Sequence, residues 1–165
     1  MKHIPLIATG GTIASRPTEN GLAPQLLADD ILRCVPALGS LCRIDAVQPM
    51  NIDSTNMSPD CWLALADCLR AHYDQYDGFV ITHGTDTMAY TACALSYLVP
   101  RSGKPLVLPG AQKSIYVQAT AARRNPYATF LAAQDAHLTA AYVLHTALGV
   151  VGSRPPPQPP TPPTT

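Results

Sequence analysis

At 165 residues, with 47% hydrophobic and 13% charged residues, the sequence has the composition of one globular domain with a substantial core, which excludes a disordered chain. Its formal net charge is zero, so it lacks the basic surface expected of a nucleic-acid-binding protein. Since no segment is long and apolar enough to predict a membrane span or a secretory signal, we expect a cytoplasmic protein with no nucleic-acid or membrane partner.

The first predicted element is a buried strand over residues 4–8, which ends at the adjacent glycines Gly10 and Gly11. Two adjacent glycines let the chain turn sharply and let backbone N–H groups approach a ligand. The hydroxyl of Thr12 follows this turn, at the edge where open α/β sheets tend to bind ligands. The pattern alone fits a nucleophile or ligand contact and an ordinary turn equally well.

The stretch over residues 16–24 lacks periodicity and is rich in turn-forming residues, so it predicts a mobile loop that could act as a lid. Beyond it, strands and helices alternate. Helices are predicted over residues 28–35, 58–77, 88–99 and 119–137, the last one kinked or divided at Pro126, and strands over residues 43–47, 78–82, 104–108 and 140–145, the third stopped by Pro109. This order predicts a three-layer α/β/α fold with a largely parallel open sheet.

Residues 152–165 differ from the rest because prolines dominate them. Such a segment favours an extended, unstructured tail that follows one domain over residues 1–151. A ligand for a proline-binding module is a less persuasive interpretation, since the segment has no charged residue after Arg154. A third interpretation is a frameshift or truncation near Gly152.

Neither the five cysteines nor His83 gives much support for a metal site. The cysteine count is odd and no C-x-x-C pair is present, which favours reduced core thiols at Cys34, Cys42, Cys61, Cys68 and Cys93. His83 has no second ligand cluster nearby in the sequence, and no phosphate-binding glycine motif is present. We therefore expect no metal or other cofactor.

Polar side chains follow three of the predicted strands: Thr12, then Asp53-Ser54-Thr55, then Thr85-Asp86. The carboxyl ends of parallel strands meet at one edge of a sheet, so these groups should converge there. A threonine hydroxyl is a poor nucleophile unless a neighbouring group takes its proton. The residues by themselves thus indicate a hydroxyl-rich, anionic pocket for a small polar substrate.

Residues 8–15 (ATGGTIAS) and 80–88 (VITHGTDTM) resemble the two signature segments of the bacterial-type L-asparaginase family, in the family's order. Residues 53–55 lie where that family has its substrate-binding serine loop, and residues 109–112 (PGAQ) resemble the segment after its next strand. The resemblance covers roughly residues 4–151, is closer to the cytoplasmic type, and points to the family's N-terminal domain.

This resemblance implies hydrolysis of the side-chain amide of L-asparagine to L-aspartate and ammonia, without metal or cofactor. By position, Thr12 would attack the amide carbon and form an acyl-enzyme. Thr85 would assist proton transfer or activate water, and Asp86, beside it, would also hold the α-ammonium group of the substrate.

The remaining implied contacts bind the substrate. Ser54 and the backbone N–H groups of the loop from Asp53 to Thr55 would bind the α-carboxylate. Gly11 and neighbouring amides would stabilise the oxyanion. The carbonyl of Ala111 would contact the substrate amide.

The sequence departs from the family pattern in three ways. The family pairs its second threonine and aspartate with a lysine beyond the strand predicted at residues 140–145, but the last lysine here is Lys113. The loop over residues 16–24 has no tyrosine to assist the first threonine. The family also has a smaller C-terminal domain that completes its sites within a homo-oligomer. We therefore predict an N-terminal domain, truncated or frameshifted near Gly152, whose turnover is impaired.

Other functions stay open at this point. A related amidohydrolase could act on glutamine, including as the glutamine-hydrolysing subunit of a tRNA amidotransferase, although a tRNA partner favours a basic surface. A non-catalytic protein could keep the amino-acid pocket without turnover. The chain could also be a pseudogene fragment with no selected function.

Overall fold

The protein forms one six-stranded sheet with strand order β4-β1-β5-β6-β7-β8. The computed structural model describes residues 1–11, 15–18, 21–24, 28–33, 36–110, 120–138, 141–145 and 149–153. The strands of this sheet are β1 (His3–Ala8), β4 (Arg43–Val47), β5 (Phe79–Thr82), β6 (Leu106–Gly110), β7 (Ala141–His145) and β8 (Gly149–Ser153). Neighbouring strands from β4 to β7 pair in parallel, and β8 pairs with β7 antiparallel.

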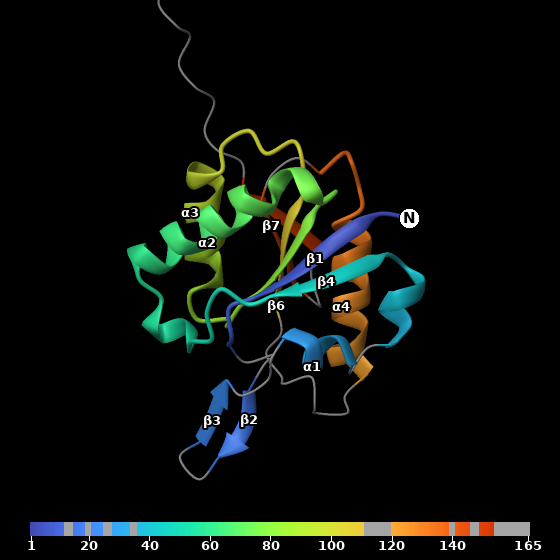
Figure 1. Cartoon of the computed structure of the whole chain (residues 1–165). Coiled ribbons are helices and arrows are strands. Elements are labelled where there is room, and N and C mark those ends of the chain that lie inside the picture. The colour runs from blue at the N-terminus through green and yellow to red at the C-terminus, as the bar shows by residue number, and fades with distance from the viewer. Residues whose placement is uncertain are drawn as a thin grey trace, which may run out of the picture.

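Helices cover both faces of the sheet (Figure 1). They are α1 (Ala28–Arg33), α2 (Pro59–His72), α3 (Met88–Leu98) and α4 (Thr120–Ala132), with short 3₁₀ turns η2 (Pro36–Ser40), η3 (Ser54–Asn56) and η4 (Tyr73–Gln75). The helices α1 and α4 lie on one face, whereas α2 and α3 lie on the other. The expected three-layer α/β/α fold with a largely parallel sheet is confirmed. None of the helices in the described ranges is long and apolar enough to cross a membrane.

The central strands are buried on both faces because their side chains alternate between two cores. In β1, Leu6 packs in the cluster that includes Phe130 of α4, whereas its neighbour Ile7 packs in the cluster that includes Leu65 of α2. Strands covered on both faces have near-continuous apolar sequences, as residues 4–8 do. Helix α2 begins at the start of the range predicted for it, residues 58–77, with Ser58 as its N-cap and Pro59 in its first turn.

One prediction about the chain after β1 was wrong. The segment over residues 16–24, expected to be a mobile loop without strands, contains β2 (Ser15–Thr18) and β3 (Gly21–Pro24), which pair antiparallel as a separate two-stranded sheet. Each strand of such a ribbon is an edge strand, and edge strands tolerate prolines such as Pro17. Figure 1 draws this ribbon at the bottom of the view, beyond the six-stranded sheet.

Three further boundaries differ from those expected. Strand β6 continues through Pro109 to Gly110, and helix α4 continues through Pro126, which is buried. Strand β8 was not predicted, and it includes Gly152 and Ser153, the first two residues of the expected tail. Residues 154–165 lie outside the described residues.

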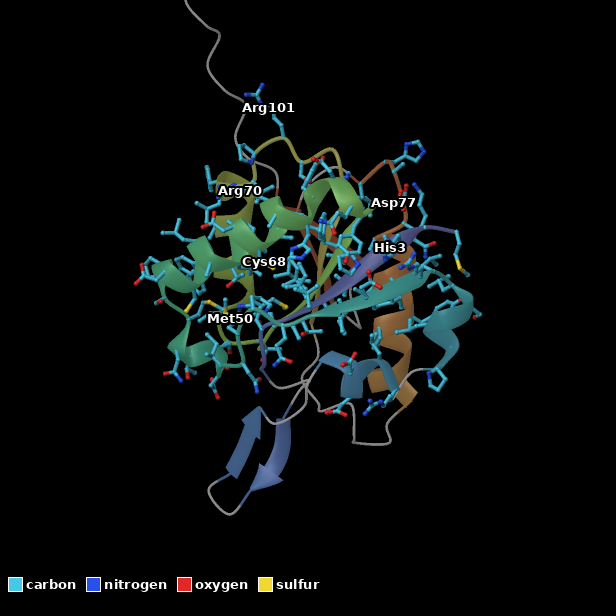
Figure 2. All side chains as sticks on the ribbon, viewed as in Figure 1. His3, Met50, Cys68, Arg70, Asp77 and Arg101 are labelled. Atoms are coloured by element: carbon cyan, nitrogen blue, oxygen red, sulfur yellow. The ribbon has the colours of Figure 1, made fainter. Side chains whose placement is uncertain are left out.

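The two ends of the sheet differ in chemistry. Figure 2 labels His3 and Asp77 near the start of β1, and Met50 at the opposite end, in the loop that follows β4. At the amino edge, the His3 backbone N–H donates to Asp77 Oδ2 (2.7 Å), and His3 Nε2 lies 2.8 Å from Asp45 Oδ2. Tyr76 also donates to Asp45, at 3.0 Å. Ser54, Thr85 and Asp86, which the sequence singles out, lie at the other, carboxyl edge.

Candidate functional site

The double-glycine turn after β1 brings this strand end against the loop that follows β4. Gly10 and Gly11 have φ angles of 102° and 79°, which L side chains rarely adopt. The Gly11 N–H donates to the Ile52 carbonyl (3.1 Å), and the Ile52 N–H donates to the Thr9 carbonyl (3.0 Å). A Cβ at Gly10 would overlap the backbone of Ile52. The glycines are therefore required by this close backbone approach.

The segment after β5 packs directly on the same turn. A Cβ at Gly11 would overlap the backbone nitrogen of Gly84, and a Cβ at Gly84 would overlap the hydroxyl of Ser54. The three strand ends thus pack so closely that a side chain at Gly10, Gly11 or Gly84 would not fit. The crossovers after β1 and β5 lead to helices on opposite faces, α1 and α3. Switch points of this kind are where open α/β sheets bind ligands.

Two side chains from different loops form the centre of this edge. Ser54 Oγ donates to Asp86 Oδ2 at 3.0 Å, and the Thr87 hydroxyl donates to the Ser54 carbonyl at 2.8 Å. Ser54 is buried, whereas Asp86 is exposed and Thr85 is partly buried. A hydroxyl donor and an accessible carboxylate therefore stand side by side at the surface of the turn. Thr87 was not predicted as a site residue, because nothing in the sequence distinguishes it from the other hydroxyl residues nearby.

Asp53 has a different part in the same loop. It caps η3, and its Oδ1 accepts from the backbone N–H (2.9 Å) and the hydroxyl (2.8 Å) of Thr55. The Thr55 N–H is the main reason that the pKa of Asp53 is lowered from its ordinary value. The Asp53 carboxylate thus holds the turn that presents Ser54.

His83, weighed in the sequence as a metal ligand, lies fully buried in a hydrogen-bonded chain. Its Nδ1 lies 2.7 Å from the Gly84 carbonyl oxygen, and its Nε2 lies 2.8 Å from Thr91 Oγ1. The indole N–H of Trp62 donates to the same Thr91 oxygen at 2.9 Å. Burial lowers the pKa of His83. A threonine on the apolar face of α3 is the signal that could have revealed this chain.

The structure brings together most of the predicted site residues. Gly11, Ser54 and Asp86 converge at the carboxyl edge, with Asp53, Thr55 and Thr85 beside them in the same two loops. Thr12 and Ala111 lie outside the described residues. Thr9, also at the turn, donates its hydroxyl to the Thr82 carbonyl (2.7 Å), which gives it a structural role. Within the described ranges, no three His, Cys, Asp or Glu side chains gather as a metal site would require.

The cysteines fit the expected core thiols only in part. Cys42 is buried, and burial raises its pKa to about 11. Cys61 and Cys68 are partly buried on α2, and Cys93 is exposed on α3, so the prediction of a core thiol was wrong for Cys93. Cys34 lies outside the described residues.

Together the fold and this edge define an α/β protein in which a double-glycine turn, a serine loop and an H-G-T-D segment share one site. The model of the family described as Asparaginase, N-terminal matches residues 3–148. The chain belongs to the asparaginase family.

Individual relatives agree with this assignment. The chain is 41% identical over 118 residues to L-asparaginase 1 of Escherichia coli K12, covering 67% of this chain and 34% of that protein. It is 43% identical over 117 residues to one subunit of the glutamyl-tRNA(Gln) amidotransferase of Methanococcus maripaludis, covering 69% and 28% respectively. The chain thus spans about a third of the length of the curated relatives that it matches.

Solved structures give the same fold. The thermostable L-asparaginase from Thermococcus kodakarensis aligns with a TM-score of 0.74 at 36% identity, covering 86% of this chain and 43% of that one. A probable cytoplasmic L-asparaginase from Campylobacter jejuni aligns with a TM-score of 0.74 at 32% identity, covering 87% and 44%. The chain is therefore similar in fold and sequence to the first part of these proteins.

Proposed function

We propose that this chain carries the amino-acid-binding and acyl-forming half of an L-asparaginase site, which hydrolyses L-asparagine to L-aspartate and ammonia. The observation that carries the proposal is the pair formed by Ser54 Oγ and Asp86 Oδ2, 3.0 Å apart at the carboxyl edge. Membership of the asparaginase family supports it.

The chemistry of an amino acid explains why this pair is informative. The α-carboxylate and the α-ammonium group are attached to the same carbon, so a site for both must place a donor next to a carboxylate. Ser54 supplies the donor, and the exposed Asp86 supplies the carboxylate for the ammonium in a charge-assisted hydrogen bond. With the α-carboxylate and the α-ammonium group both held, the substrate has a single orientation, and its side-chain amide has a single position in the site.

In the proposed reaction, the Thr12 hydroxyl oxygen attacks the amide carbon and the hydroxyl proton passes to a base. The C–N bond breaks, ammonia leaves after protonation, and the aspartyl group is held on Thr12 as an ester. Water, activated beside Thr85, then attacks the ester and releases L-aspartate and the free hydroxyl. Backbone N–H groups near Gly11 stabilise the negative oxygen in both steps.

A second candidate is hydrolysis of the glutamine side-chain amide, alone or as part of a tRNA amidotransferase. The similarity to the Methanococcus maripaludis amidotransferase protein favours it. The formal net charge of zero does not favour direct binding to tRNA by this chain.

The test is ammonia release by the purified chain from L-asparagine and from L-glutamine, with L-aspartate binding measured by calorimetry. We expect binding of L-aspartate and slow ammonia release, since turnover of this chain is predicted to be impaired, with asparagine hydrolysed faster than glutamine. Thr12→Ala should abolish ammonia release while binding persists. Ser40→Ala is the matched control, because its hydroxyl donates to Ala37 at the surface of η2, away from the carboxyl edge.

Each result has a distinct meaning. Faster ammonia release from glutamine selects the second candidate. Aspartate binding without release from either amide indicates a binding protein. Release that survives Thr12→Ala refutes the proposed nucleophile, and absence of both binding and release refutes the whole proposal.

A further inference from the structure

Between the two helices on one face of the sheet, three buried or partly buried polar side chains form a chain that ends at the candidate site. Trp62 of α2 donates to Thr91 of α3, Thr91 lies 2.8 Å from Nε2 of His83, and Nδ1 of His83 lies 2.7 Å from the Gly84 carbonyl oxygen. Thr91 and His83 have no exposed surface. Neither the proposed binding contacts nor the proposed chemistry uses these groups.

The chemistry at each end of the chain fixes its direction. An indole N–H can only donate, and a carbonyl oxygen can only accept. His83 therefore carries its proton on Nδ1, and this N–H donates to Gly84. In a neutral ring, Nε2 then accepts from the Thr91 hydroxyl, whose oxygen accepts from Trp62. Complete burial disfavours the charged ring, in keeping with this arrangement.

The hydrogen bond to the Gly84 carbonyl orients the peptide that joins Gly84 to Thr85. In a trans peptide the N–H of the second residue points away from the carbonyl of the first. No cis peptide bond occurs in the described ranges. With its carbonyl directed at His83 Nδ1, this peptide therefore turns the Thr85 N–H away from the imidazole ring.

Without a further contact, the Gly84–Thr85 peptide would be free to rotate out of this orientation. Residue 84 must be glycine because the Ser54 hydroxyl occupies the place of a Cβ, and a glycine peptide has more rotational freedom than any other. A side chain from the preceding residue supplies the missing restraint. The restraint is buried, so water does not compete for it.

We propose that His83 is a positioning residue, which fixes the Gly84–Thr85 peptide so that the Thr85 N–H and hydroxyl are presented to the substrate. Trp62 and Thr91 hold the imidazole in the tautomer that this requires. The inference rests on the proposed function, since the substrate it serves is the amino-acid amide assigned to the Ser54–Asp86 site.

Two substitutions of His83 separate positioning from simple filling of space. In His83→Asn, the side-chain amide places an N–H donor where Nδ1 stood, so the bond to Gly84 is kept. In His83→Gln, the amide reaches the Nε2 position and Thr91, and the bond to Gly84 is lost. Both variants remove the ring, so a merely structural role predicts equal effects.

We expect His83→Asn to bind L-aspartate within about threefold of the wild-type affinity and His83→Gln to bind at least about tenfold more weakly, at similar melting temperatures. Equal affinities in the two variants would overturn the proposal. Imidazole ¹⁵N spectra of the free wild-type chain should show the proton on Nδ1, and a proton on Nε2 alone would also overturn it.

A failure of the proposed function can be recognised separately. If the wild-type chain neither binds L-aspartate nor releases ammonia, that function is refuted, and the positioning role is judged in the free chain. The amide signal of Thr85 should then shift and exchange faster in His83→Gln but stay near its wild-type position in His83→Asn. Equal amide behaviour in the two variants rejects the positioning role.

Discussion

Ser54 and Asp86, 32 residues apart in the sequence, meet through a hydrogen bond of 3.0 Å between the serine hydroxyl and the aspartate carboxylate. The pair holds the loops after β4 and β5 in contact. Under the proposed function, a substrate carboxylate would compete with Asp86 for the Ser54 hydroxyl, whereas the substrate ammonium group would pair with Asp86 and so weaken its hold on that hydroxyl. We therefore expect this site to bind an amino acid, which has both charged groups, in preference to a simple carboxylate.

Replacing Ser54 with alanine removes the donor while leaving the backbone of the loop in place. A hydrogen bond to a charged group contributes about 1.5–3 kcal/mol, so Ser54→Ala should weaken L-aspartate binding by about ten- to hundredfold. Calorimetric titration of both proteins measures this loss. The idea fails if Ser54→Ala binds L-aspartate as tightly as the wild-type chain does.

The close packing of Gly84 on Ser54 gives a second prediction. Gly84→Ala places a methyl group on the Ser54 hydroxyl, and such overpacking should lower the free energy of unfolding by about 1–3 kcal/mol. Gly39→Ala is the matched control, because no atom lies within 4 Å of a Cβ there. Alanine restricts the unfolded chain, so this control should stabilise the protein by about 0.4–1 kcal/mol.

Urea unfolding of both glycine variants tests the prediction. The double variant Gly84→Ala, Ser54→Gly should recover much of the lost stability, because the hydroxyl that the new methyl meets is gone, but it should not recover L-aspartate binding. A Gly84→Ala protein as stable as wild type would show that the two loops separate easily.

The third prediction concerns the buried hydroxyl of Thr91. Thr91→Val keeps the side-chain shape but leaves His83 Nε2 and the Trp62 N–H without their shared partner, which should cost about 1–3 kcal/mol. Thr91→Ser keeps the hydroxyl and should recover the polar part of this loss. Trp62 is the one tryptophan in the sequence, so its emission reports directly on the bond.

Fluorescence-detected urea unfolding measures stability and emission together. The emission maximum should move in Thr91→Val and return in Thr91→Ser. A serine variant that resembles the valine variant in emission would show that the methyl group, and not the hydroxyl, holds this contact.

Periodicity was sufficient to predict most of the fold. The apolar run at residues 4–8 and the stripe of α2 that includes Leu65 and Leu69 are strong local signals, and both occur where expected. Proline misled at Pro109, because the buried sheet outweighs the local preference, whereas α4 continues through Pro126 without the division that was one of the two outcomes predicted there. The ribbon β2–β3 was missed since neither of its short strands shows an alternating pattern.

The candidate site was predicted less completely, for a physical reason. Ser54 and Asp86 could be predicted to converge because strand order and direction bring their loops to one edge. The contacts of His83 could not be predicted from the sequence. They join His83 to Thr91 and, through Thr91, to Trp62, which lie on two helices, and the way these helices pack together depends on the tertiary fold. Sequence spacing carries no information on that arrangement.

At the amino edge, the carboxylate of Asp77 gives a pH-dependent contribution to stability. The backbone N–H of His3 is the main reason that the pKa of Asp77 lies below its ordinary value, and Lys2 adds to the effect. A depressed pKa means that the unfolded chain binds the proton first as the pH falls. The contribution is therefore fully present above about pH 4, the ordinary value for aspartate, and is lost as the pH falls through the lower pKa of the folded state.

Asp77→Asn should consequently have a lower melting temperature than wild type at pH 6, and the difference should narrow between about pH 4 and pH 2 as the wild-type carboxylate is protonated. Thermal unfolding across this range, followed by circular dichroism, measures the gap. Salt should leave most of the gap at pH 6, because a backbone N–H is screened less than the exposed Lys2 ammonium. A gap that stays constant from pH 6 to pH 2 would mean that the charge of Asp77 makes no contribution and that only its shape matters.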